Sequence, residues 1–196
     1  MIIGSGESPN QCYTTDLANS TSENTYIVSD SNIYFYTNCQ TYSNAKKTVY
    51  INTSGVLMGA AWNDYAEYRT QVSPIEPGYC VYSNNAGQVS KTTEKFQACD
   101  GIVSDTFGFS IGETDECKTP LAVAGRVLAY CEGNRYDYNA GDTVCAGPDG
   151  KVVKMTREEI KEYPDRIVGI VSEIPEYEIW GAGNIKVNGR IWIKVK

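Results

Sequence analysis

The sequence predicts a mainly β protein: a short stalk-like β segment followed by a compact, barrel-like β domain with one short helix. Three observations favour strands. The apolar residues make up 41% of 196 residues and are rich in Val, Ile and Tyr, which are residue types that strands prefer. Short apolar runs are separated by turns that contain Gly. In addition, a pattern of residues in the second part of the chain occurs twice.

The first 55 residues form the predicted stalk segment. They are rich in Ser, Thr, Asn and Tyr, carry few charges and contain short runs such as Ile33-Tyr34-Phe35-Tyr36. A segment with so little apolar surface gains too little from burial to offset its conformational entropy alone. We therefore expect residues 1–55 to be the end of a fibre stalk that needs partner chains, and residues 56–196 to be a separate compact domain.

The compact part contains the repeated pattern. Five residues recur at one constant spacing, namely Gly78, Gly87, Val89, Lys91 and Thr93 as Gly141, Gly150, Val152, Lys154 and Thr156. Further along, residues 101–105 (GIVSD) correspond to residues 169–173 (GIVSE). Coincidence between common turn residues is the alternative, but the shared spacing favours a duplicated, barrel-like β domain.

Two local patterns predict a helix and a hairpin. Thr156 can cap residues 157–162, which begin with acidic residues in the first turn and end before Pro164. Near the end of the chain, Asn188-Gly189 is a dipeptide typical of a tight β-hairpin turn.

Composition excludes several classes of function. A formal net charge of -7 disfavours binding of nucleic acid. No apolar run is long enough for membrane insertion, and the amino terminus lacks the pattern of a signal peptide. The sequence has no His, and its seven Cys include no C-x-x-C pair, so we expect no metal and no cofactor. Any catalysis must therefore use carboxylates, Lys, hydroxyls or thiols.

The strongest candidate site is the aromatic segment 60–68 (AAWNDYAEY), which contains Asp64 and Glu67. If the two carboxyls share a pocket, ionisation of one raises the pKa of the other, which provides an acid and a base near neutral pH. The alternative is a strand or turn that carries two solvated acids. The spacing of the two acids does not decide between these interpretations.

The peptide bond between Asn63 and Asp64 is the candidate scissile bond. The side-chain amide nitrogen of Asn63 can attack its own carbonyl carbon, which forms a succinimide and releases Asp64 as a new amino terminus. Alternatively, one carboxylate activates a water while the other protonates the leaving nitrogen. Both routes remain open from the sequence.

Four segments resemble a known family: residues 62–68 (WNDYAEY), 101–105, 120–127 (PLAVAGRV) and 166–172 (RIVGIVS). On these segments, residues 56–196 resemble the autoproteolytic intramolecular-chaperone domain of phage neck-appendage or tail-spike proteins, which is classed among glutamic peptidases. The resemblance implies a homotrimer that helps an upstream fibre stalk to fold and then cuts itself off before Asp64. Asp64 and Glu67 match the catalytic pair of the family.

One residue departs from the family pattern, because Asn63 stands where we expect Ser. A trimerisation tip that does not cleave itself is therefore one alternative. A carbohydrate-binding fibre tip is another, because the abundant Tyr and Trp can stack on sugars of a host-surface glycan. In each case the resemblance implies a virion tail or appendage protein that is assembled in the cytoplasm of the bacterial host.

Overall fold

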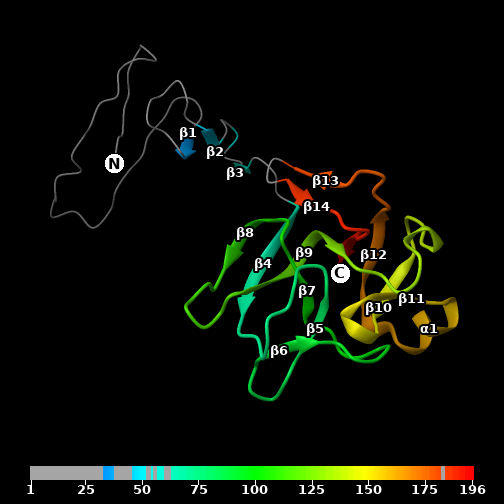
Figure 1. Cartoon of the computed structure of the whole chain (residues 1–196). Coiled ribbons are helices and arrows are strands. Elements are labelled where there is room, and N and C mark those ends of the chain that lie inside the picture. The colour runs from blue at the N-terminus through cyan, green and yellow to red at the C-terminus, as the bar shows by residue number, and fades with distance from the viewer. Residues whose placement is uncertain (1–32, 38–45, 52–53, 55–56, 60–62, 182–183) are drawn as a thin grey trace, which may run out of the picture. The chain divides into compact units, whose positions relative to one another are not determined.

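A computed structural model describes residues 33–37, 46–51, 54, 57–59, 63–181 and 184–196. By its internal contacts the chain divides into two units, Met1–Ala60 and Ala61–Lys196 (Figure 1). The predicted division at residues 55 and 56 stays a prediction.

The first unit contains a small antiparallel sheet. It is made of β1 (Ile33–Thr37), β2 (Lys46–Ile51) and β3 (Leu57–Gly59), with β2 in the centre. The apolar run at residues 33–36 therefore forms a strand, as predicted, and Ile33 lies opposite Ile51 on β2.

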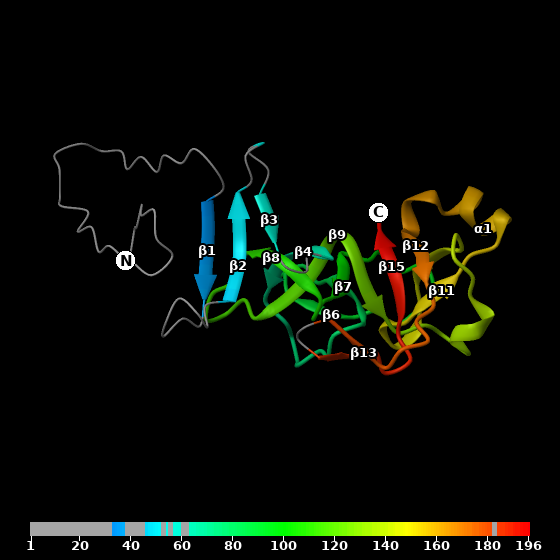
Figure 2. The same cartoon turned by 90° about the horizontal axis from the view of Figure 1, so that it is seen from above.

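The second unit is built on one sheet of ten strands. These are β4 (Asp64–Arg69), β5 (Cys80–Ser83), β6 (Val89–Lys91), β7 (Gly101–Val103), β8 (Phe107–Ile111), β9 (Thr119–Ala129), β10 (Thr143–Ala146), β11 (Val152–Lys154), β12 (Ile167–Glu173) and β15 (Ile191–Val195). Eight of them follow the order β11-β10-β12-β15-β9-β7-β5-β6, while β4 pairs with β9 and β8. All pairs are antiparallel except β4 with β8. The sheet curls into a half-barrel (Figure 2), which confirms the predicted mainly β class.

The strand order is symmetric about β15 and β9, in agreement with the repeat in the sequence. The hairpin β5–β6 and the hairpin β10–β11 occupy equivalent places at the two ends of the order. The backbone hydrogen bonds repeat as well: Gly78 N–H donates to Val103 O at 2.7 Å, and Gly141 N–H donates to Val171 O at 2.8 Å. The second unit of the chain is therefore a duplicated β structure.

The predicted helix forms as α1 (Arg157–Glu162). The Thr156 side chain accepts a hydrogen bond from the backbone N–H of Glu159, and the Glu159 side chain accepts one from the N–H of Thr156. This reciprocal arrangement satisfies donors that the first turn leaves unpaired. Within the described part of the chain, short 3-10 turns occur at Arg135–Asp137, Pro148–Gly150 and Pro164–Arg166. Among the described residues, no helix has the length and apolar character needed to cross a membrane.

The predicted turn at residues 188 and 189 also forms, but it does not join a hairpin. Asn188 and Gly189 have φ angles of 51° and 74°, as a tight turn of this kind requires. However, β14 (Ile185–Lys186) before the turn pairs with β13 (Ile179–Trp180), whereas β15 after it enters the large sheet. The hairpin prediction is therefore wrong in its pairing, because packing of β15 between β12 and β9 outweighs the local preference.

The buried side chains of the second unit lie on both faces of the sheet, because alternate residues of β15 belong to different clusters. The largest fully buried side chain is Trp192 on β15, which packs with Leu128 and Val187. A larger cluster combines residues from both repeats, including Ile102 on β7 and Val144 on β10. Since each repeat buries its apolar face against the other, neither is expected to fold alone.

Candidate functional site

The bond between Asn63 and Asp64 lies at the entry to β4, where it is enclosed by two strands. Asp64 is the first residue of β4, opposite Gly125 on β9 and Phe107 on β8. Both flanking strands pair with β4 along much of its length, so the backbone beside this bond is held on two sides. The position of the bond is therefore fixed by the sheet itself.

Strand β9 holds the carbonyl group of Asn63. The backbone N–H of Arg126 donates a hydrogen bond of 2.8 Å to the Asn63 oxygen. Gly125, with a φ of +101°, packs directly against this peptide: a Cβ atom at Gly125 would lie 2.2 Å from the same oxygen. Only glycine allows so close an approach. A donor fixed in this way stabilises negative charge that develops on the carbonyl oxygen during attack on its carbon.

The Asp64 carboxyl is buried, with 4% of the residue exposed. Thr106 donates its hydroxyl to Asp64 Oδ1 at 2.7 Å, whereas Oδ2 is buried and has no partner among the described residues. Burial raises the pKa of Asp64 to about 6, and the negative charge of Asp105 adds to this effect, while the hydroxyls of Ser104 and Thr106 oppose it. Near neutral pH the carboxyl can therefore both give and take a proton.

The side-chain amide of Asn63 is also without a partner. Its Nδ2 atom is buried and forms no hydrogen bond within the described part of the chain. Buried amide groups are nearly always hydrogen-bonded, so a buried amide nitrogen without a partner calls for an explanation. An amide that is free to approach the neighbouring carbonyl carbon is what the succinimide route requires.

Glu67 lies three residues after Asp64 on the same strand. Side chains alternate along a strand, so residues three apart point to opposite faces. The burial of β4 follows this alternation, with Asp64 and Ala66 buried and Tyr65 and Glu67 half-buried. Within one chain, β4 therefore does not bring the two predicted catalytic carboxyls together.

The face of β4 that carries Glu67 is apolar at its rim. The ring of Tyr65 stacks on Phe109 of β8, with ring centroids 5.4 Å apart. Phe109 and Ile111 on β8 are 46% and 47% exposed. Glu67 lies opposite Ile111 in the register of the two strands, so its carboxyl borders an exposed apolar surface.

Sequence reasoning missed the groups that surround Asp64. Ser104 and Thr106 lie between β7 and β8, and Gly125 lies on β9. Two of the segments that carried the family resemblance, 101–105 and 120–127, contain Ser104 and Gly125. The pattern therefore included these positions, but their roles follow only from the pairing of β4 with β8 and β9.

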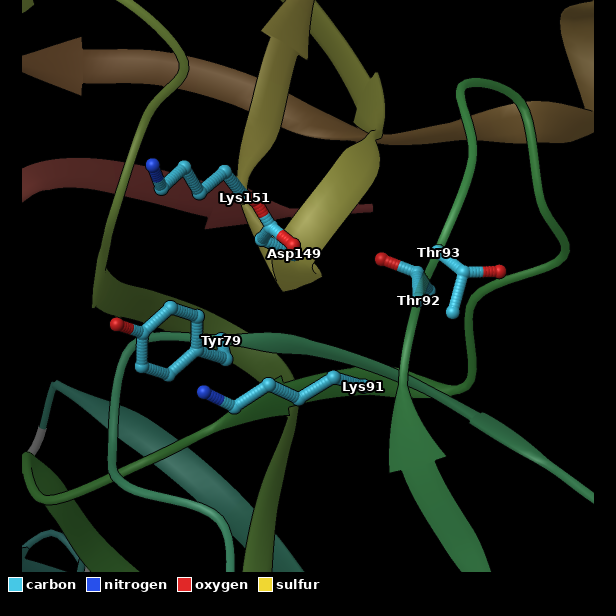
Figure 3. Close-up of a pocket in the computed structure, with 6 residues that line it drawn as sticks. All are labelled: Tyr79, Lys91, Thr92, Thr93, Asp149 and Lys151. Atoms are coloured by element: carbon cyan, nitrogen blue, oxygen red, sulfur yellow. The ribbon is translucent and has the colours of Figure 1, made fainter.

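A cavity of the second unit lies away from this bond. It has a volume of about 460 Å³ and lies between the hairpin β5–β6 and the turn 148–150 (Figure 3). Its lining consists of Tyr79, Lys91, Thr92, Thr93, Asp149 and Lys151. Lys91 Nζ lies 3.4 Å from the centroid of the Tyr79 ring. Neither predicted catalytic carboxyl reaches this cavity, so the buried groups around Asp64 are the better candidate for chemistry.

Comparison with known proteins finds likeness in structure but not in sequence. No protein-family model matches the chain, and no curated protein matches it. The fold is similar to the crystal structure of the pre-mature bacteriophage phi29 gene product 12, with 16% identity, a TM-score of 0.48 and coverage of 77% of this chain and 25% of the phage chain. It is also similar to the crystal structure of the C-terminal fragment of the same phage protein, with 17% identity, a TM-score of 0.46 and coverage of 68% of this chain and 100% of the fragment. The chain thus spans a quarter of the length of the pre-mature phage protein.

Proposed function

We propose that the second unit is the C-terminal intramolecular chaperone of a phage tail appendage or spike, and that it cuts itself between Asn63 and Asp64. One observation carries the proposal. The Asp64 carboxyl, which is buried and has a pKa of about 6, directly follows the Asn63–Asp64 peptide bond, and the carbonyl oxygen of that bond already accepts a hydrogen bond from Arg126 N–H. The motif around Asp64 that resembles the autoproteolytic chaperone family supports the same assignment.

The geometry favours cyclisation of Asn63 as the route of cleavage. Asn63 Nδ2 bonds to its own carbonyl carbon while the bond from this carbon to the nitrogen of Asp64 breaks. The proton lost from Nδ2 is transferred to the leaving nitrogen, and the Asp64 carboxyl, which can give and take a proton near neutral pH, is the candidate carrier. The products are a carboxy-terminal succinimide and a free amino terminus at Asp64. Because the reacting groups belong to adjacent residues, a high effective concentration takes the place of substrate binding.

Homotrimer formation gives Glu67 a role that a single chain does not provide. Glu67 borders the exposed Phe109 and Ile111, a surface of the kind that commonly contacts a partner. We propose that this face meets a neighbouring copy, so that Glu67 acts on the bond of that copy. Alignment of three chains before the stalk folds lowers the entropy that long-range β pairing must overcome.

The first test is the intact mass of freshly purified chain beside the variants Asp64→Ala and Glu67→Ala. The proposal predicts fragments 1–63 and 64–196 for the wild type and whole chains for both variants. Asp115→Ala, which removes a fully exposed carboxyl in a loop, is the matched control and cleaves as the wild type does. Wild-type chain that stays whole for days contradicts the proposal. The mass of the first fragment identifies the route, because the succinimide product is lighter by one water than the product of hydrolysis.

The second test asks which chain supplies Glu67. Chains with Glu67→Ala keep Asp64 and the scissile bond, and chains with Asp64→Ala keep Glu67. If Glu67 acts between chains, co-expression of the two variants restores cleavage of the Glu67→Ala chain. If it acts within its own chain, the mixture stays uncleaved.

A trimerisation domain that does not cleave itself is the second candidate. The specific observation in its favour is Asn63 in place of the expected Ser, together with the apolar surface at Phe109 and Ile111. This function predicts a trimer of whole chains, and charge introduced by Ile111→Asp is expected to dissociate it.

A further inference from the structure

Arg190 is a buried cation at the far end of the chain from the scissile bond. It lies between the turn 188–189 and β15, and only 2% of the residue is exposed. Two of its nitrogens donate to the two carboxylate oxygens of Asp105 at 2.9 and 3.0 Å. The guanidinium also donates to the backbone oxygens of Val187, at 3.1 Å, and Lys186. Planar, two-point pairing of this kind fixes both partners in orientation.

The backbone makes room for the Arg190 side chain. A Cβ atom at Gly78, where φ is +99°, would lie 2.6 Å from Arg190 Cδ. The ring of Tyr130 also lies next to Gly78, with its centroid 5.9 Å from the guanidinium carbon of Arg190. Burial of a charge is costly, and an apolar side chain of similar volume often stabilises a core as well or better. Stability alone therefore does not explain why a charged pair occupies this place.

Asp105, the partner of Arg190, is adjacent in sequence to the residues that surround Asp64 at the scissile bond. Asp105 lies between Ser104 and Thr106, the two residues whose hydroxyls act on the Asp64 carboxyl. Thr106 N–H donates to Ser104 Oγ at 3.0 Å, and Ser104 N–H donates to the Pro120 oxygen on β9 at 2.8 Å. The segment 104–106 is thus held by β9 on one side and by Arg190 on the other.

We propose that Arg190 is a positioning residue for self-cleavage: through Asp105 it fixes the segment 104–106 around Asp64, so that the bond is cut only after the C-terminal strand has docked. The inference rests on the proposed self-cleavage. Arg190 immediately precedes β15, the last strand of the chain as described, and β15 lies between β12 and β9 in the sheet. The cleavage site is therefore completed only when β15 has entered the sheet.

The role of Arg190 can be measured through the pKa of Asp64, because Arg190 balances the negative charge of Asp105. Asp105 is the charged group that acts on the Asp64 carboxyl. The neighbours of Asp64 on β8 and β9 are Phe107 and Gly125, and the Arg126 side chain is directed toward Glu173 at 3.5 Å. When Arg190 is removed, the charge of Asp105 is no longer balanced and raises the pKa of Asp64 further.

The experiment compares Arg190→Met and Arg190→Lys with the wild type, by the rate of self-cleavage between pH 5 and 9. Arg190→Met is expected to move the pH midpoint upward by about one unit and to lower the plateau rate at least tenfold. Arg190→Lys keeps the charge but loses the two-point pairing, so the midpoint stays while the plateau rate falls. Arg166→Met is the matched control, because Arg166 pairs with the exposed Asp165, and it leaves both quantities unchanged.

A second readout separates this inference from the proposed function. Titration of the Asp64 carboxyl by NMR in chains that also carry Glu67→Gln needs no cleavage, and Arg190→Met must raise its midpoint there too. If the wild type never cleaves, the proposed function fails while this titration still decides whether Arg190 acts on Asp64. An unchanged midpoint in folded Arg190→Met protein overturns the inference. Should that variant not fold, a wild-type plateau rate in Arg190→Lys overturns it instead.

Discussion

Replacement of Asp64 by Asn tests whether the pKa of the buried carboxyl is raised as far as its surroundings imply. Burial raises the pKa of Asp64 from 3.8 to about 6, and each unit corresponds to about 1.4 kcal/mol. Ionisation of Asp64 in the folded state therefore costs about 3 kcal/mol of stability at pH 8. The free energy of unfolding therefore carries no penalty from Asp64 below pH 3.8, where the carboxyl is protonated in both states. This stability is lost as pH rises through about 6.

Asn is close in shape, keeps an acceptor for the Thr106 hydroxyl and does not ionise. The comparison is made between Glu67→Gln and Glu67→Gln/Asp64→Asn, since both chains are expected to stay whole. The Asn variant is expected to gain about 3 kcal/mol relative to its parent as pH rises from 3.5 to 8. A difference of this size shifts the melting temperature by roughly 10 °C in a domain of this length.

The assay is thermal unfolding followed by circular dichroism from pH 3.5 to 8 at one fixed protein concentration. Any penalty from the new, unpaired amide N–H is independent of pH and moves the whole curve without changing its slope. Asp115→Asn, at a fully exposed carboxyl, serves as the control and is expected to show little change with pH. A constant difference between variant and parent between pH 4 and 7 would refute the reasoning, because Asp64 would then titrate normally.

Three further predictions concern single contacts. Gly125→Ala places a Cβ 2.2 Å from the Asn63 oxygen, so it is expected to abolish self-cleavage in the mass assay. It is also expected to destabilise the domain by more than 2 kcal/mol, of which about 1–2 kcal/mol comes from the positive φ alone. The control Gly87→Ala, with open space around it, costs only the φ strain. Thr106→Val removes the donor to Asp64 Oδ1 and is expected to raise the pKa of Asp64 in an NMR titration. Thr106→Ser keeps a hydroxyl donor and is expected to leave this pKa at its wild-type value. Thr156→Ala breaks the cap of α1 and is expected to cost about 1 kcal/mol in urea unfolding without changing the cleavage rate.

Much of the fold follows from local sequence, because local interactions decide it. The cap at Thr156 and the turn at Asn188 depend on residues within a few positions, and both form where the sequence predicts them. The pairing of β15 could not be found in this way, since its partner residues on β12 and β9 are 19 or more positions away in the chain. The same limit applies to the site: Asp64 stands out in the sequence, but Thr106 and Gly125 become its neighbours only through the pairing of β4.

Comparison of the two repeats indicates that the fold does not require an acid at position 64. Thr70 and Tyr130 are equivalent, since they accept the N–H groups of Val89 and Val152 in the two repeats. Six residues before each lie Asp64 and Ala124, so the second repeat forms the same strand with an exposed alanine where the first has a buried acid. The first repeat also adds β8, which pairs in parallel with β4 and follows directly after Thr106. One difference between the two copies is therefore the set of groups that buries a carboxyl beside one peptide bond. A difference of this kind is expected if the first copy carries out the proposed self-cleavage and the second has only a structural role.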